Sequence, residues 1–227
     1  RIMAKILFSP IGGSDPIRNF RDGSMLHICR YYLPDKVILY LTGEMYQHHL
    51  QDNRYVYCLE ELSKKISHPF DIEIITRDEL KEVQDYEYFY DDFRTCIGQI
   101  TSQMNSEDEL FLNVSSGTPA MKNALIILAT LAEFSFKPIQ VSTPLKRSNY
   151  MDENVRKYEV EEQWLLDEDN EENVDVTSRC EEVKSLNLIK LLKTNILEKH
   201  LMAYDYPAAY GGKRFGKSYF GKSLVND

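Results

Sequence analysis

The stretch Glu109–Lys122, ELFLNVSSGTPAMK, joins the two patterns that decide the fold of this 227-residue chain. Its beginning, ELFLNV, is a short apolar run that is typical of a buried strand. Gly117 then permits a tight turn, and Pro119 suits the first turn of a helix. The stretch therefore predicts a strand, a loop of small residues and a helix in direct succession.

The same pattern recurs along the chain. Further runs rich in β-branched residues predict strands at Lys5–Ser9, Lys36–Leu41, Asp71–Thr76 and Pro138–Ser142. Apolar residues at helical spacing predict helices at Ser24–Tyr32, Arg54–Ile66, Glu87–Asn105 and Pro119–Phe134. Strands that alternate with helices predict an α/β fold with a Rossmann-like, doubly wound and mainly parallel sheet. In the expected order 3-2-1-4-5, the first and fourth strands are neighbours, and ligands bind beyond their carboxyl ends.

Composition excludes several classes of protein. With 43% hydrophobic and 28% charged residues, the chain is an ordinary globular protein rather than a disordered one. The longest apolar stretch, Ala124–Ala132, is about half of the roughly 20 residues that a bilayer requires, so no membrane contact is expected. No metal site or disulfide framework is expected, because the cysteines are few and far apart: Cys29, Cys58, Cys96 and Cys180. We interpret them as reduced thiols and therefore expect a cytoplasmic protein.

Charge is distributed unevenly. The net charge of −9 argues against broad binding to long nucleic acid. Residues 1–182 carry 19 basic and 33 acidic side chains, whereas residues 183–227 carry 8 and 3. The helical stripe that begins at Val183 predicts the start of a C-terminal helical domain over residues 181–210, followed by a basic flexible tail over residues 211–227.

Two loops are the candidate site. Ser9–Arg18 (SPIGGSDPIR) follows the first predicted strand, and Asn113–Lys122 (NVSSGTPAMK) includes the loop after the fourth. In such loops, backbone N–H groups and hydroxyls face the space beyond the sheet, and a helix N-terminus adds partial positive charge. An acidic protein can hold a phosphodiester in this way. The first loop lacks G-x-G-x-x-G, which argues against a nicotinamide dinucleotide.

Three segments carry a family resemblance. SPIGGSDPIR at 9–18, DGSMLHICR at 22–30 and NVSSGTPAMKNAL at 113–125 resemble the CARF domain of type III CRISPR-associated ancillary ribonucleases, the Csm/Csx CARF-HEPN proteins, over about residues 3–180. The resemblance implies a homodimer that binds a cyclic oligoadenylate messenger, and we favour the hexa-adenylate ring over the tetra-adenylate ring. It also implies antiviral defence through allosteric activation of a metal-independent HEPN endoribonuclease. That active site is not expected in this chain, and target RNA would be contacted only through the HEPN domain.

Carried over by position, the resemblance implies that both loops contact the ring. The residues are Gly12, Gly13, Ser14 and Asp15 in the first loop, and Ser115, Ser116, Gly117, Thr118, Met121 and Lys122 in and after the second. Thr118 or Asp15 would pair with a ribose 2′-hydroxyl. No cofactor and no catalytic residue is expected. An Arg-x(4 to 6)-His pair of the HEPN type, Arg21 to His27, lies within the CARF region, so we interpret it as structural.

Alternatives to a binding module remain open. A ring nuclease that slowly cleaves the bound ring, or a Rossmann-like nucleotide-binding enzyme of another family, would form product without added metal. A DNA-binding regulator is disfavoured by the acidic body of the chain and by the lack of helix-turn-helix spacing. We interpret Glu44 and His48 as a solvated helix face, since a third zinc ligand is not evident. The P-loop matches within residues 211–223 lack the strand and helix that such a loop joins.

Overall fold

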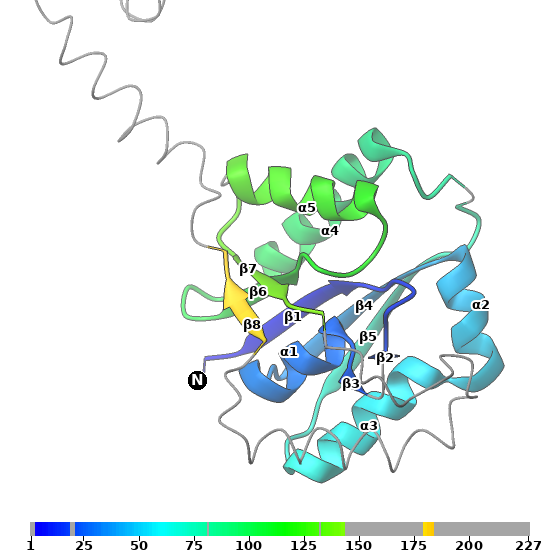
Figure 1. The fold of residues 1–227 in the computed structure, drawn as a ribbon. Coiled ribbons are helices and arrows are strands. Elements are labelled where there is room, and N and C mark those ends of the chain that lie inside the picture. The colour runs from blue at the N-terminus through cyan, green and yellow to red at the C-terminus, as the bar shows by residue number, and fades with distance from the viewer. Residues whose placement is uncertain (1–2, 19–20, 81, 132, 144–178, 184–227) are drawn as a thin grey trace, which may run out of the picture.

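The computed structural model describes residues 3–18, 21–80, 82–131, 133–143 and 179–183. Its main feature is a six-stranded sheet in the order β5-β4-β1-β6-β7-β8 (Figure 1). The strands are β1 (Lys5–Pro10), β4 (Lys36–Thr42), β5 (Asp71–Arg77), β6 (Glu109–Asn113), β7 (Lys137–Val141) and β8 (Cys180–Glu182). All pair in parallel except β8, which runs antiparallel to β7. This confirms the predicted α/β, Rossmann-like sheet and the order 3-2-1-4-5 of the five predicted strands.

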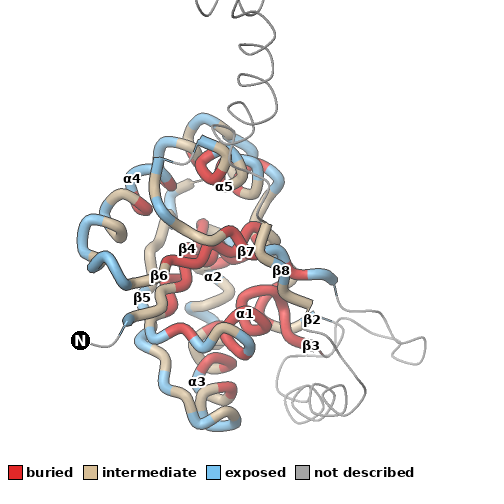
Figure 2. The backbone as a smooth tube through the Cα atoms, turned by 90° about the vertical axis from the view of Figure 1, so that its left-hand side faces the viewer, coloured by how far each residue is buried: buried red, intermediate tan, exposed pale blue. Residues whose placement is uncertain are grey.

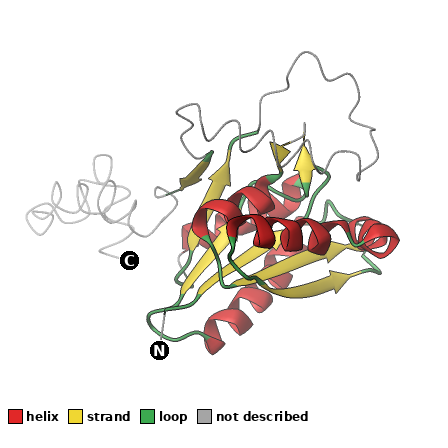
Figure 3. Ribbon diagram, turned by 90° about the horizontal axis from the view of Figure 1, so that it is seen from below, coloured by secondary structure: helices red, strands yellow, loops and turns green. Residues whose placement is uncertain are grey.

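Helices cover both faces of the sheet (Figures 1 and 3). They are α1 (Ser24–Tyr32), α2 (Gly43–Asp52), α3 (Arg54–Ile66), α4 (Tyr86–Gln103) and α5 (Pro119–Leu131). Helices α1 and α3 lie on one face, and α4 and α5 lie on the other. Such an arrangement follows from parallel strands, because each crossover must return across a face of the sheet. The predicted bounds of α1 and α3 match the observed helices, and α4 and α5 end slightly earlier than predicted.

The core consists of two apolar clusters, one on each side of the sheet. Successive residues of a strand point to opposite faces, so Leu7 packs with α1 and α3 while Phe8 packs with α4 and α5. Leu39 and Tyr40 divide in the same way. The buried backbone runs along the central strands and through α1 (Figure 2). This two-sided burial explains why the central strands read as continuous apolar runs.

Four elements were not among the predicted strands and helices, although Glu44 and His48 were expected on a helix face. Ile17–Arg18 (β2) and Arg21–Asp22 (β3) pair as a small antiparallel sheet, α2 follows β4 without an intervening loop, and β8 adds an edge strand. Each is defined by its packing on a neighbour rather than by its own hydrophobic pattern. Several predictions fall outside the described residues: the helical stripe beyond Val183, the tail at 211–227 and its P-loop matches. The alternating pattern at Tyr158–Leu166, which predicts an added edge strand or hairpin, also lies outside them.

Candidate functional site

The two candidate loops meet where β1 and β6 end. These strands pair in parallel, so the loop after β1 (residues 11–16, the first loop) and the loop after β6 (residues 114–118, the second loop) leave the same edge of the sheet. A Cβ atom added to Gly12 would lie 2.7 Å from the backbone nitrogen of Gly117. Gly117 itself has a φ of +88°, and a Cβ atom there would lie 2.7 Å from the sulfur of Met121. Both glycines are therefore required for the loops to touch.

Asp15 ties the two loops together. Its Oδ2 accepts hydrogen bonds from the Ser116 hydroxyl and from the Gly12 N–H, the latter at 3.3 Å. Its Oδ1 accepts the Met25 N–H at 3.2 Å and the Ser24 hydroxyl at 3.5 Å, at the start of α1. Burial raises the pKa of Asp15, and these hydrogen bonds offset only part of that effect. Asp15 therefore acts as an internal brace, with little of its carboxyl group accessible to a ligand.

Asn113 is a second brace, and it was not among the predicted site residues. It ends β6 and is fully buried. Its side-chain nitrogen donates to the hydroxyls of Ser9 and Ser24, both at 2.9 Å, and its oxygen accepts the Ser115 N–H at 3.0 Å. The signal in the sequence was an amide at the end of an otherwise apolar run, a group that must be hydrogen-bonded when buried.

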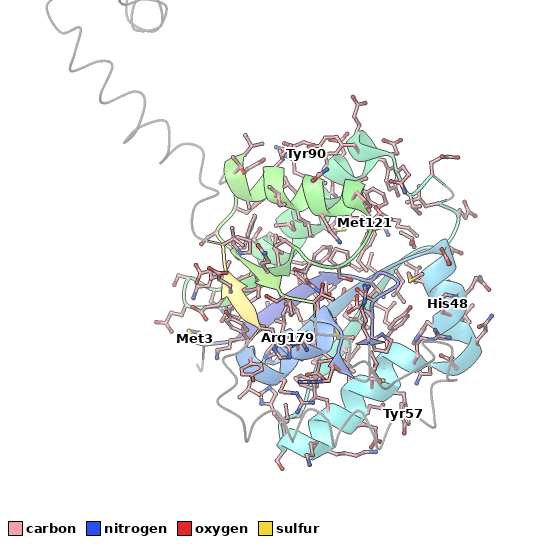
Figure 4. The ribbon with its side chains drawn as sticks, viewed as in Figure 1. Met3, His48, Tyr57, Tyr90, Met121 and Arg179 are labelled. Atoms are coloured by element: carbon pink, nitrogen blue, oxygen red, sulfur yellow. The ribbon has the colours of Figure 1, made fainter. Side chains whose placement is uncertain are left out.

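The hydroxyls of the second loop also bond within the protein. Ser115 Oγ accepts the Val141 N–H at 2.8 Å, which fastens the loop to β7. Thr118 Oγ1 donates to the carbonyl of Val83 at 2.8 Å and accepts the Met121 N–H at 3.4 Å, as an N-cap of α5. Met121 is buried, with its sulfur 3.4 Å from the Thr118 nitrogen (Figure 4). These side chains shape the loop from inside.

The groups left for a ligand are mainly backbone N–H groups. Among the described residues, the N–H groups of four loop positions donate no hydrogen bond: Gly13, Ser14, Ser116 and Gly117. The second loop also leads directly into the N-terminus of α5, whose partial positive charge favours an anion nearby. Gly13 is exposed, whereas Ser14, Gly117 and Lys122 are partly buried and Ser116 is only 1% exposed. This set of donors suits phosphate oxygens.

His27 lies in the interior on α1, away from solvent. It is 2% exposed, and its Nδ1 is 3.4 Å from Asp22 Oδ2. Asp22 in turn receives two hydrogen bonds from the guanidinium of Arg30, at 2.7 and 3.2 Å. Burial alone would raise the pKa of Asp22, but the hydrogen bonds from His27 and Arg30 and their charges outweigh it and hold the pKa below its usual value. These contacts support a structural role for His27.

The remaining candidates form no site within the described residues. Glu44 and His48 share α2, as their spacing suggested, and the ring of the adjacent His49 stacks between Tyr46 and Tyr55. No three side chains of the metal-binding types gather as a ligand set in the part of the chain that the structure describes. In that same part, no helix combines the length and the apolar character needed to cross a membrane.

Several known proteins are similar to this chain in sequence. Residues 71–180 match the model of the Cas_Csm6 CARF domain. The CRISPR system endoribonuclease Csm6 of Enterococcus italicus is 34% identical over 210 residues, covering 90% of this chain and 47% of that protein. The Csm6 proteins of Mycobacterium tuberculosis and Streptococcus thermophilus are 34% and 32% identical, again over 90% of this chain and 48% and 46% of their own lengths.

A solved structure gives the same relationship. Enterococcus italicus Csm6 bound to cyclic hexa-2′-fluoro-hexa-dAMP superposes with a TM-score of 0.65 and 31% identity, and covers 100% of this chain and 55% of that one. The chain therefore spans about half the length of the relatives that it matches. Sequence and structure agree on the fold, and this chain carries a CARF domain of the Cas_Csm6 type.

Proposed function

We propose that this chain is a sensor that binds a cyclic oligoadenylate at the two joined loops. One observation carries the proposal: the first and second loops touch at Gly12 and Gly117, and together hold four N–H groups that bond to nothing else in the described residues. A related protein, Csm6 of Enterococcus italicus, was solved with a cyclic hexanucleotide analogue bound. We favour the hexa-adenylate ring over the tetra-adenylate ring as the ligand.

In this proposal, the backbone contacts the phosphates and the side chains hold the backbone in place. The N–H groups of Gly13, Ser14, Ser116 and Gly117 donate to phosphate oxygens, and Lys122 adds a positive charge. Hydrogen bonds to a charged group contribute about 1.5 to 3 kcal/mol each. The Thr118 hydroxyl has one acceptor position left after its two internal hydrogen bonds, and a ribose 2′-hydroxyl suits that position.

The ring is proposed to lie across a homodimer. A cyclic RNA with rotational symmetry presents the same groups to two identical half-sites, as an isologous interface requires. Each chain then supplies one pair of loops, and calorimetry should give one ring per two chains. Occupancy favours one dimer arrangement over another because the ring binds that arrangement more tightly.

The bound state is proposed to activate a HEPN endoribonuclease, as part of CRISPR antiviral defence in the cytoplasm. The matched relatives are endoribonucleases about twice the length of this chain. In this proposal residues 3–180 form the sensor, residues 181–210 begin a helical linker and residues 211–227 form a basic tail. Target RNA is contacted by the HEPN domain, and neither DNA nor a membrane is a partner.

Thermal denaturation with three ligands tests the proposal: cyclic hexa-adenylate, cyclic tetra-adenylate and linear hexa-adenylate. At a hundredfold excess over its dissociation constant, a ligand specific for the folded state adds about 2.7 kcal/mol, or roughly 5 to 10 °C in Tm for a chain of this size. We expect the cyclic hexa-adenylate to give the largest shift. Equal shifts with the linear RNA would contradict ring recognition, and chromatography of the incubated ring separates binding from slow cleavage.

A further inference from the structure

Helix α1 begins directly against the proposed ring site. A Cβ atom added to Gly23, the residue before the helix, would lie 2.6 Å from the carbonyl oxygens of Ser14 and Pro16. The carboxylate of Asp15 accepts the N–H of Met25, one of the helix N-terminal groups that lack a partner within the helix. The other oxygen of the same carboxylate accepts from Ser116 in the second loop. A displacement of either loop is therefore passed to the N-terminus of α1.

One turn further along, α1 holds the residue that precedes strand β8. The Nε2 of His27 accepts the backbone N–H of Arg179 at 3.1 Å. The guanidinium of Arg179 lies 3.1 Å from Nδ1 of the same ring and donates to the carbonyl of Asp22 at 2.9 Å. Figure 4 shows Arg179 beside α1. The His27 ring is thus enclosed between Asp22 and Arg179, two residues that are far apart in the sequence. We call this set of contacts the α1–β8 contact.

The interior side of this contact is fixed. Seven of the nine residues of α1 are buried, and Arg30 donates two hydrogen bonds to the fully buried Asp22. Buried ion pairs of this kind are costly to break, because a lone buried charge remains. Helix α1 therefore responds to its surroundings as one body rather than by bending.

Strand β8, unlike α1, is short and weakly held. It has three residues and pairs with β7 at the edge of the sheet, through Ile139, Gln140 and Val141. Its ends are held by hydrogen bonds between Ser142 and Arg179 and from the Val183 N–H to the Pro138 carbonyl. Short edge elements open at a small fraction of the global unfolding free energy. A single hydrogen bond from the Arg179 N–H to His27 therefore changes the population of docked β8 measurably.

We propose that α1 couples the ring site to β8, with His27 as the positioning residue that transmits the change. This rests on the proposed function, since it assigns the regulation of that site. When a ring fixes the two loops, Asp15 fixes the start of α1, and His27 then holds Arg179 so that β8 stays docked on β7. Residues 184–227 follow β8 in the sequence. The docking of β8 is thereby linked to ring occupancy, and the linkage is reciprocal.

Hydrogen exchange at the β8 amides tests the coupling in the full chain. In the wild-type chain, we expect cyclic hexa-adenylate to slow exchange at Arg179–Glu182 by at least about fivefold, the lower end of ordinary allosteric coupling. In His27→Leu, the ring is still bound, but the slowing at these amides falls below about twofold. His68→Leu is the matched control and should retain the full effect, because the His68 side chain bonds to the Pro34 carbonyl rather than to Arg179. Retention of the full slowing in His27→Leu overturns the proposal.

A second arm needs no ring and separates the two proposals. Ser116→Ala removes a donor from Asp15, and we expect it to speed exchange at the β8 amides in the wild-type background but not in His27→Leu. If Ser116→Ala leaves hydrogen exchange at the β8 amides unchanged, the coupling is refuted, whether or not the ring binds. If the cycle shows coupling while no ring binds, the proposed ligand is wrong and the coupling stands. Arg179→Gln, at a partly exposed position, removes the guanidinium contacts but keeps the backbone N–H bond to His27, so it should weaken the coupling less than His27→Leu does.

Discussion

Gly12→Ala should separate the two loops, because the new methyl group would strike backbone. Its Cβ would lie 2.7 Å from the Gly117 nitrogen and 3.0 Å from the Gly117 Cα, whereas ordinary contact begins at 3.4 Å. The loops must therefore part by about 0.7 Å, and neither backbone can turn aside as a side chain can. Overpacking of this kind costs typically 1 to 3 kcal/mol of stability. The displaced N–H groups of the loops lose at least one hydrogen bond to a ring phosphate. Affinity for cyclic hexa-adenylate should therefore fall about 10- to 100-fold.

Two other glycines provide controls for this variant. An added Cβ at Gly13 meets nothing within 4 Å, so Gly13→Ala should leave the stability within about 0.5 kcal/mol of wild type or slightly above it. Gly98 lies inside α4 and would make an ordinary contact with Phe134, so Gly98→Ala should leave ring affinity unchanged and stabilise the helix. Calorimetry and urea denaturation measure both quantities. Wild-type ring affinity in Gly12→Ala would refute the contact between the loops as the basis of the site.

Other substitutions test the braces around the loops. Ser116→Ala and Thr118→Ala should each weaken ring binding by about 1 to 3 kcal/mol in calorimetry, and unchanged affinity in both would contradict the site assignment. Asn113→Ala should lower the unfolding free energy by about 1 to 3 kcal/mol, because Ser9, Ser24 and the Ser115 N–H each lose a buried partner; a wild-type urea midpoint would argue against this role. Asp22→Asn should cost about 3 to 5 kcal/mol at pH 7 by leaving Arg30 without its counter-charge. Because folding lowers the pKa of Asp22, the ionised carboxylate stabilises the fold above about pH 4, and this stabilisation is lost as the pH falls below that value. The difference in unfolding free energy between Asp22→Asn and wild type should therefore narrow between about pH 4 and 2. A difference that stays constant with pH would refute the assigned ionisation.

The sheet was predictable because its signals are local and redundant. Each central strand is buried on both faces, so its sequence is an apolar run that no other element of similar length explains. Glycine and proline residues mark the ends of these runs, as at Gly117 and Pro119. Strand order followed from topology alone, since the expected reversal of direction next to the first strand places β1 beside β6.

The missed elements have no such local signal. Strand β8 has three residues and exists through its pairing with β7, while β2 and β3 contribute two residues each. In the site, the loops were correctly expected to converge, but the directions of their hydroxyls were not predictable. Ser115 turns to the Val141 N–H and Thr118 to the Val83 carbonyl, partners fixed by tertiary packing. The same holds for Asp15, whose sequence position at a loop suggested a ligand contact rather than a brace.

Amide spectra of the chain labelled with ¹⁵N at glycine and serine test the central claim most directly. The account predicts that cyclic hexa-adenylate moves the amide signals of the four unengaged donors more than any other glycine or serine signal: Gly13, Ser14, Ser116 and Gly117. Signals of Gly98 and Ser102, on α4, should stay in place. Binding of the ring with the four loop signals unmoved, or with the main shifts elsewhere, would contradict the claim that the two loops hold the ligand.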